Sequence, residues 1–405
     1  MSRHYDIAIV GGGFVGGTLA CALAATSRRI ALIESKPVSS VNGTGRNRDE
    51  RSIALALASK KMFDALGVWE QIGLHSIAIR KIHISDRGRF GAMRMDCRNH
   101  ESEGFGYMVP AEKLILSLQE HLRRYENIHC IRPYKVSDIE SHADRVILHG
   151  EGEPIQTDLL IAADGTNSFI RNKLGIPTNE KKYHQTAIVG NVSVDDDHQF
   201  TAYERFTREG PLTLLPHAGN NCGFVWVLPD NIARELVARS DEDFLLQLQQ
   251  AFGYRLGYFS GIGKRFAYPL SLLVSHRRTQ GRVVLIGNAA QTLHPIGAQS
   301  LNLAMRDVAE LSEMLHASQD GLDGIDEKLC AYASGRQSDI KRTIRLTDIF
   351  NFLFTTNDLV LSRTRGIGLA LLGAIPVLEN IVLRQSSGVP SSVANLLQGK
   401  PLQSA

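Results

Sequence analysis

The sequence predicts an α/β fold in which a discontinuous Rossmann-like domain carries an inserted antiparallel sheet and is followed by a helical C-terminal segment. Three observations predict it. The chain opens with an apolar strand, closely spaced glycines and an alanine-rich helix. Residues 183–266 instead alternate between apolar and polar side chains, which is typical of antiparallel strands. From Gln299 onward the spacing of apolar residues is mainly helical.

The opening stretch has the pattern of a dinucleotide-binding turn. Residues 7–10 are expected to form a buried strand and residues 18–25 a helix, with Gly11, Gly13 and Gly16 between them in G-x-G-x-x-G spacing. The first glycine permits a tight turn, the second lets backbone approach a diphosphate, and the third lets the helix pack on the strand. The N–H groups at the start of the helix then face the phosphates.

A single acid follows this turn at the expected distance. Glu34 ends the second predicted strand, where a carboxylate can bind the ribose of a dinucleotide. A glycine motif alone is also compatible with an ordinary turn before a helix. Here strand, glycines, helix, strand and acid follow one another within 34 residues, and this order favours dinucleotide binding.

Length and composition limit the remaining possibilities. At 405 residues, the chain is long enough for two subdomains. A net charge of +3 gives no reason to expect nucleic acid as a partner, and the short basic stretch SHRRTQGR is expected to be a solvated turn. Five scattered cysteines lack metal-ligand spacing, so no metal site is predicted and a reducing compartment is favoured. We expect neither a signal peptide nor a membrane span.

These patterns predict how the chain is divided. The dinucleotide-binding domain is expected at 1–75, 100–176 and 278–345, and the substrate domain at 76–99 and 177–277. Residues 346–405 are expected to form a C-terminal helical segment and tail. Apolar spacing predicts helices over 53–66, 111–125 and 241–252.

A second motif ends an apolar strand in the stretch LLIAADG. Asp164 and Gly165 lie at the carboxyl end of this predicted strand, where open α/β sheets bind ligands. The alternative is a simple Asp-Gly turn, which needs no ligand.

A third motif follows the strand that ends near residue 286. Gly287 and Asn288 begin a short loop through His294, and a long helix starts near Gly297. The N-terminus of that helix, including Asn302, can face an anionic ring system. The alternatives are a turn histidine at 294, and capping or packing roles for Asn302 and Asp307.

The three motifs together resemble the single-component FAD-dependent aromatic hydroxylases, the class of para-hydroxybenzoate hydroxylase. Within it, the chain resembles the UbiH-type hydroxylases of ubiquinone biosynthesis over about residues 5–375. ERSIAL matches their arginine-containing FAD segment at Arg51, AYERFTREGPLTLLP matches their substrate-domain stretch, and QSDI followed by TD matches their C-terminal helix. GNAAQTLHPI matches this type in Asn288 and Gln291, where most relatives have Asp and His.

The resemblance implies cofactors, partners and location. It implies FAD as the bound cofactor, NADPH or NADH as a transient co-substrate, and O2 and a polyprenylated methoxyphenol as substrates. FAD would be bound by Gly11, Gly13, Gly16, Glu34, Arg51, Asp164, Gly287, Asn288, Gly297 and Asn302. A cytoplasmic protein is expected, with peripheral contact to the inner face of the membrane or with a quinone-biosynthesis complex. The apolar stretch 366–378 suits that contact, and equally suits a buried helix.

No catalytic base is evident, and His294, His217 and Tyr254 are candidates by residue type only. Phe206, Phe224 and Trp226 could line a substrate pocket or fill the core of the sheet. Ala298 and Ser300 stand where the family has glycines that approach the flavin ring. A Cβ at such a position can crowd the ring or alter its mobility. The alternative functions are a flavoprotein of this fold acting on another aromatic or prenyl substrate, and a non-catalytic subunit of the quinone-synthesis complex.

Overall fold

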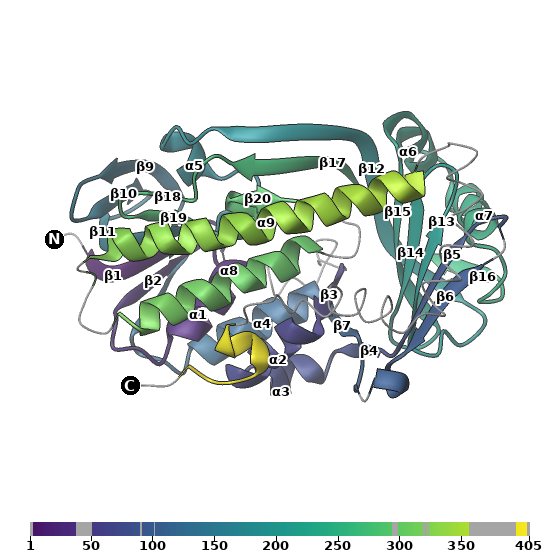
Figure 1. Cartoon of the computed structure of the whole chain (residues 1–405), viewed down its shortest axis with the longest axis horizontal. Helices are drawn as coiled ribbons and strands as arrows, with labels where there is room; N and C mark the ends of the chain where they lie inside the picture. Colours follow the sequence, from purple (N-terminus) through teal and green to yellow (C-terminus); the bar gives the residue numbers. More distant parts are fainter. Residues whose placement is uncertain are drawn as a thin grey trace.

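A computed structural model describes residues 3–37, 51–89, 91–100, 102–293, 299–318, 322, 324–355 and 394–402. Two large sheets lie at opposite ends of the molecule, and the long strands β12 and β17 extend between them along one side (Figure 1). The helices are α1 (Phe14–Leu23), α2 (Leu57–Ala65), α3 (Trp69–Gly73), α4 (Ala111–Leu122), α5 (Phe169–Lys173), α6 (Asp230–Val237), α7 (Asp241–Phe252), α8 (Gln299–His316) and α9 (Ile325–Thr355). Short 3-10 turns are η2 (Cys97–His100), η3 (Gly287–Ala289) and η5 (Asn395–Gln398).

The first sheet has eight strands, with the main order β18-β19-β11-β1-β2-β8 and with β10 and β9 continuing from β11. Its strands are β1 (Arg3–Val10), β2 (Ile30–Ile33), β8 (Ile128–Ile131), β9 (Val136–Ser141), β10 (Val146–Gly150), β11 (Ile155–Ala162), β18 (Thr279–Gln280) and β19 (Val283–Leu285). The pairs β19-β11, β11-β1, β1-β2 and β2-β8 are parallel. Helices α1, α4 and α8 contribute to the apolar core on one face of these strands.

The second sheet has nine strands and is mainly antiparallel, in the order β20-β17-β12-β15-β14-β13-β5-β6, with β16 paired to β12. Its strands are β5 (Lys81–Asp86), β6 (Ala92–Asp96), β12 (Thr178–Val194), β13 (Thr201–Phe206), β14 (Pro211–Pro216), β15 (Asn221–Pro229), β16 (Phe259–Ile262), β17 (Phe266–Ser275) and β20 (Gln291–Thr292). Helices α6 and α7 cover one face with an apolar cluster, and the other face looks toward the first sheet's domain.

A small sheet of β3 (Ser52–Ala56), β7 (Gly106–Pro110) and β4 (Ile77–Ile79) lies between the two large ones. The helix expected over 53–66 is therefore wrong in its first turn. Residues 52–56 pair antiparallel with β7, and the helix begins only at Leu57. The backbone hydrogen bonds of this sheet outweigh a helical spacing of apolar residues, which is ambiguous in short segments.

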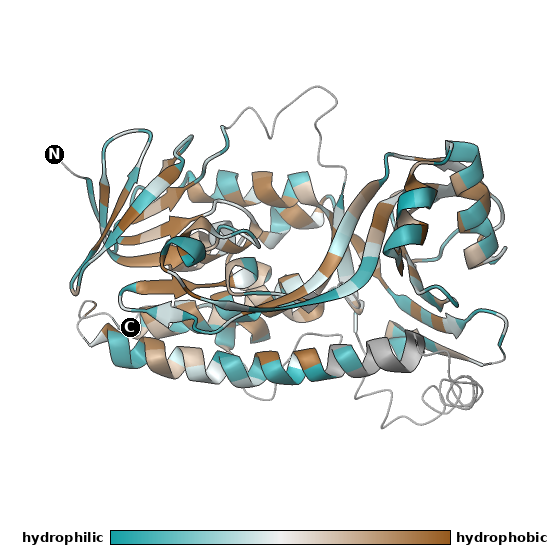
Figure 2. Ribbon diagram, turned by 90° about the horizontal axis from the view of Figure 1, so that it is seen from above, coloured by the Kyte–Doolittle hydropathy of each residue, from teal (hydrophilic) through white to brown (hydrophobic). Residues whose placement is uncertain are grey.

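Helix α9 extends beside α8 from the first sheet to the near side of the second sheet (Figure 1). Polar and apolar residues alternate along it (Figure 2), and Ile325, Leu329, Tyr332, Arg336 and Ile340 recur at helical spacing on its buried face. Near the end of its described side chains, Asp348 accepts a hydrogen bond of 3.2 Å from Tyr183 in β12. One helix thus contacts both the parallel domain and the strand that continues into the second sheet.

Candidate functional site

Four separated segments meet at the carboxyl ends of the parallel strands. In the register of the sheet, Val10 pairs with Ile33 on one side and with Ala162 on the other, and Ala162 pairs with Leu285. The segments that follow these strands therefore share one edge. They are the glycine turn, the Glu34 turn, the Asp164–Gly165 turn and the Gly287–Asn288 turn, at the position where α/β sheets bind ligands.

The three glycines of the first turn differ in what surrounds them. Gly11 has a φ of +109°, and a Cβ there would lie 2.4 Å from the carbonyl oxygen of Ala163. A Cβ on Gly16 would lie 2.0 Å from the carbonyl oxygen of Gly11. These two glycines are therefore required by backbone packing. Gly13, by contrast, has no atom within 4 Å of its Cβ position, and it begins α1 without a side-chain cap.

The carboxylate of Glu34 is held by the backbone around it. Its Oε2 accepts a 3.0 Å hydrogen bond from the N–H of Gly12, and its Oε1 accepts one of 3.0 Å from the N–H of Lys36. These bonds fix the second strand's turn against the glycine turn. Binding of a ribose by Glu34 stays a prediction.

The Asp164 turn contains an unsatisfied acceptor. Oδ2 of Asp164 accepts a 3.2 Å hydrogen bond from the N–H of Ile170, whereas the buried Oδ1 has no partner among the described residues. Gly165 has a φ of +86° and open space at its Cβ position. The buried Arg171 fixes this turn to the next one, since its guanidinium donates to the carbonyls of Thr166 and Ala289. Sequence reasoning did not single out Arg171 for this structural role.

These features fit an FAD molecule lying along the strand ends. The start of α1 offers uncapped N–H groups and free space in front of Gly13, which suits a diphosphate. The unpaired Oδ1 of Asp164 suits a sugar or ribitol hydroxyl, because buried acceptors are nearly always satisfied. Asn288 is half-buried on the neighbouring turn and can donate or accept through its amide.

Other residues expected at the flavin are placed as follows. Oδ1 of Asn302 accepts hydrogen bonds of 2.9 Å from the backbone of Ala56 and from Ser59 Oγ, which agrees with its alternative packing role. The hydroxyl of Ser300 forms hydrogen bonds with the backbone N–H and carbonyl of Leu293. The side chain that replaces a glycine of the family at this position therefore bonds the protein's own backbone. His294 and Gly297 lie outside the described residues, as do Ala298 and the 366–378 stretch.

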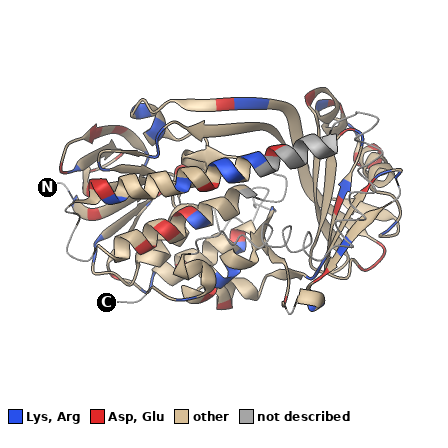
Figure 3. Ribbon diagram, viewed as in Figure 1, with Lys and Arg blue, Asp and Glu red and all other residues tan. Residues whose placement is uncertain are grey.

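A buried charge network lies directly behind the Gly287 turn. Asp307 of α8 is fully buried, and its Oδ2 accepts hydrogen bonds from the Gly287 N–H at 3.1 Å and from Gln291 at 2.8 Å. Its Oδ1 accepts from Arg336 at 2.7 Å and from Arg278 at 3.1 Å. Figure 3 shows acidic and basic residues along both α8 and α9.

The acidic and basic side chains of this network are paired with one another. Burial alone would raise the pKa of Asp307, but Arg278, Arg336 and the Gln291 hydrogen bond outweigh burial, so that the pKa is lowered. Arg336, also fully buried, further bonds Glu310 and Asp339 at 2.8 Å. The SHRRTQGR stretch is thus not simply a solvated turn, because its Arg278 is 7% exposed and paired.

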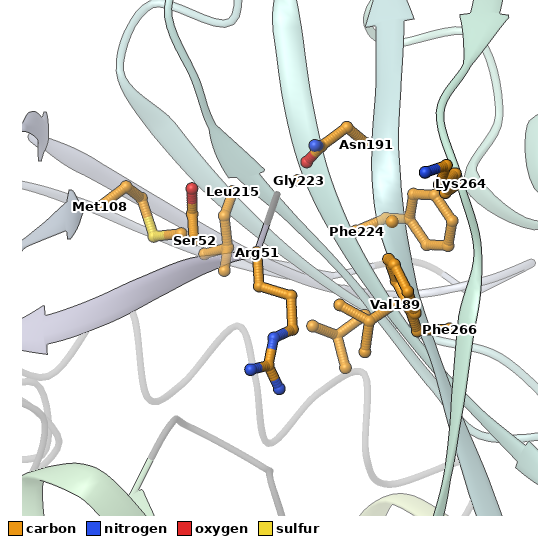
Figure 4. A pocket seen from close by; sticks show the side chains of 12 residues that line it. Arg51, Ser52, Met108, Val189, Asn191, Leu215, Gly223, Phe224, Lys264 and Phe266 are labelled. Carbon is orange, nitrogen blue, oxygen red and sulfur yellow. The ribbon is translucent and has the colours of Figure 1, made fainter. Parts of the chain in front are cut away.

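A pocket lies between the small sheet and the open face of the nine-stranded sheet (Figure 4). Arg51, Ser52 and Met108 line it on one side, and residues of β12 and β15 line it on the other. The guanidinium of Arg51 also contacts Tyr268 in β17, with a 3.4 Å hydrogen bond to its hydroxyl. Arg51 therefore sits where the two parts of the molecule meet, and its contact with FAD stays a prediction.

The three aromatic residues left open by the sequence divide between core and pocket. Trp226 and Phe224 belong to the apolar cluster under α6 and α7, and Phe206 packs against Met93 and Met95. Phe224 also borders the pocket beside Gly223. Most of this aromatic surface therefore stabilises the sheet.

Two catalytic candidates lie among the described residues. Tyr254 follows α7, is 64% exposed and packs edge-on against the exposed Tyr258. His217 follows β14 and lines a second pocket, which shares Ser52 and Asn191 with the first. The structure thus brings His217, and not Tyr254, to the pocket region.

The half-buried carboxyl of Glu204 in β13 gives a pH-dependent prediction. Burial raises its pKa to about 7, against the opposing effect of a 2.7 Å hydrogen bond from Thr213. A folded-state pKa above the unfolded one favours folding at low pH, and this contribution is lost as the pH rises from about 4.5 through 7. Glu204→Gln should therefore raise the free energy of unfolding by about 1–3 kcal/mol at pH 8.5 and leave it unchanged at pH 4.

Urea denaturation at both pH values measures this difference. The exposed Glu151→Gln, outside any helix or strand, is the matched control and should change neither value. Equal effects of Glu204→Gln at pH 4 and pH 8.5 would contradict the raised pKa.

The fold and the strand-end site define a class of protein, the enzymes that bind FAD at the carboxyl ends of parallel strands. In particular, the structure of p-nitrophenol 4-monooxygenase PnpA from Pseudomonas putida superposes with a TM-score of 0.79 at 18% identity, covering 97% of this chain and all of that one. The model of the FAD binding domain family matches residues 4–347, and the chain belongs to this family. It is an FAD-dependent monooxygenase, so the predicted cofactor and enzyme class are confirmed.

Sequence relatives agree with the predicted resemblance to ubiquinone-biosynthesis hydroxylases. Ubiquinone hydroxylase UbiL of Rhodospirillum rubrum is 32% identical over 98% of this chain and 93% of its own length. The human mitochondrial ubiquinone biosynthesis monooxygenase COQ6 is 27% identical over 90% of this chain and 88% of its own. The described residues contain no cluster of metal-binding side chains, and none of their helices has the length and apolar character to cross a bilayer.

Proposed function

We propose that this enzyme hydroxylates the ring of a polyprenylated methoxyphenol in ubiquinone biosynthesis, using NADPH or NADH and O2. The observation that carries the proposal is the pocket between the two parts of the molecule. It joins Arg51 and Ser52, at the start of the small sheet, to the largely apolar open face of the substrate sheet. The full-length similarity to UbiL and COQ6, whose names refer to ubiquinone chemistry, supports the choice of substrate.

Residues of the chain have distinct tasks in this reaction. Gly13 and the start of α1 would hold the diphosphate of FAD, and Asp164 and Asn288 would hold its sugar alcohol. Arg51 would contact FAD on the side that faces the substrate. Bound FAD supplies the activation of O2 with electrons from NAD(P)H. The sheet residues Val189, Leu215 and Phe266 would cover the ring and exclude water.

Oxygen incorporation tests the proposal. Purified protein is incubated with NADPH or NADH, ¹⁸O2 and a methoxyphenol that carries a short prenyl tail. We expect NAD(P)H oxidation stimulated by the phenol and a product heavier by one ¹⁸O atom. Oxidation without oxygen incorporation would instead support a reductase of the same fold, and protein that stays colourless after addition of FAD would support a non-catalytic subunit.

We further propose a cytoplasmic enzyme that contacts the inner face of the membrane, because the tail of its substrate resides in the bilayer. The apolar residues 366–378 suit this contact by sequence. Removal of residues 366–378, which leaves the buried Leu396 and Leu397 in the chain, should then release the protein from the membrane fraction of lysed cells. Unchanged co-sedimentation with membranes would refute this role of the segment, and FAD content of the shortened protein controls for folding.

A further inference from the structure

A histidine and an amide converge on a single point of the open sheet face. Gly223 in β15 pairs with Asn191 in β12, and its Cα faces the pocket. A Cβ placed on Gly223 would lie 3.6 Å from Oδ1 of Asn191 and 3.6 Å from Nε2 of His217. Figure 4 shows Asn191 beside Gly223 at the edge of this pocket. The glycine therefore leaves room for a small ligand group between two polar side chains.

The imidazole of His217 lacks a partner at this point. Its Nε2 is buried and forms no hydrogen bond with any described residue. Since buried polar atoms are normally satisfied, an unpartnered nitrogen beside a gap indicates a ligand atom. With the ring proton on Nδ1, Nε2 is a hydrogen-bond acceptor.

Hydrogen bonds within the protein hold the backbone around His217 before any ligand binds. Its N–H donates to the carbonyl of Asn221 at 2.9 Å and so closes the turn between β14 and β15. His198, which is 4% exposed, donates from Nε2 to the carbonyls of His217 and Gly219 at 2.8 and 3.0 Å. A side chain on such a braced turn can hold a substrate group without a large loss of conformational entropy.

We propose, on the basis of the proposed function, that His217 binds the phenol hydroxyl of the substrate above Gly223 and acts as the general base that takes the proton of this hydroxyl. The hydroxyl donates to Nε2, which accepts through its ring lone pair. As the ring reacts, the phenol O–H bond breaks and an Nε2–H bond forms, which leaves an imidazolium beside the oxygen. The imidazolium returns this proton to the solvent after the product leaves.

The electrostatic surroundings keep the imidazole ready to accept a proton. Burial first, and then His198, lower the pKa of His217, so it is neutral at pH 7. The other titratable or charged groups near it are His75, Glu112 and Lys113 in the second pocket, and Arg51 and Lys264 in the first. Activity should therefore fall only on acidification below the ordinary range of histidine, as the imidazole becomes protonated.

A comparison of two ligands and several variants tests the assignment. The ligands are 2-methoxy-6-prenylphenol and its methyl ether, which differ only at the hydroxyl, and their dissociation constants are measured with the FAD-loaded enzyme by flavin fluorescence. The wild type should bind the phenol about tenfold more tightly than the ether. His217→Ala should bind the two ligands equally. Tyr254→Phe, the exposed candidate, should behave as wild type.

Two further variants separate the binding of the hydroxyl from the removal of its proton. Gly223→Ala adds a methyl group in ordinary van der Waals contact with His217, at 3.4 Å, so the fold is retained. The methyl group fills the binding point, and discrimination between the phenol and the ether should again be lost. His217→Gln keeps an acceptor but cannot take the proton, so discrimination should persist while kcat falls about 100-fold and the acidic limb of the pH profile disappears.

Retained discrimination in both His217→Ala and Gly223→Ala would overturn the inference and leave the proposed function intact. A wild type that binds the two ligands equally would also overturn it. A wild type that binds neither and incorporates no oxygen would refute the proposed function as well.

Discussion

Replacement of Arg336 by methionine is expected to lower the free energy of unfolding by about 3–5 kcal/mol. The side chain is fully buried, and its guanidinium bonds Asp307, Glu310 and Asp339 at 2.7–2.8 Å. Methionine fills a similar volume but leaves these carboxylates with fewer positive partners in a medium of low polarity. The measurement is urea or thermal unfolding of the FAD-free protein.

The expected pH dependence follows from Asp307. Its lowered folded-state pKa contributes stability above the unfolded value near 3.8, and this contribution is lost as the pH falls through the folded value. Without Arg336 the variant should unfold at a higher pH during acid titration. Arg239→Met removes an ion pair with Glu235 that is exposed and screened by water, so it should change the free energy of unfolding far less. Equal losses in the two variants would contradict a structural role for the buried network.

Gly13→Val is expected to abolish retention of FAD while leaving the fold intact. No atom lies within 4 Å of the Cβ position, and the φ of −78° suits any residue. The valine would instead fill the space in front of α1, where backbone must approach the diphosphate. The flavin absorbance of the purified protein measures retention, and circular dichroism measures folding.

A matched control is Gly335→Val, a glycine with equally open surroundings on the exposed face of α9. It should retain its flavin. Gly16→Val should behave differently again, because its side chain would collide with the Gly11 carbonyl and unfold the turn itself. A yellow Gly13→Val protein with normal FAD content would refute the binding site at the glycine turn.

Local patterns predicted the elements that carry a periodic or capped signal. The helix expected over 241–252 has those bounds in the structure, where Ser240 caps it by accepting from the N–H of Asp243. The strands that precede the glycine turn and Asp164 were equally predictable from the sequence, because both are buried apolar runs. The alternating segment after residue 183 forms antiparallel strands as expected.

Features that depend on distant partners were not predictable. Residues 52–56 are a strand because β7, at least fifty residues later in the chain, pairs with them. Arg278 looked like a surface residue because its partner Asp307 lies on another element. The convergence of His217 and Asn191 arises from strand register, which a sequence motif does not record.

The arrangement of the strand-end site has a consequence for biosynthesis of the protein. The turn at Gly287 is held by Asp307, which in turn is held by Arg336 near the middle of α9. A ribosome must therefore release most of the polypeptide before the last wall of the flavin cleft is anchored. Cofactor capture should accordingly be a late event that follows translation, and nascent chains that stall before α9 would leave the ribosome colourless.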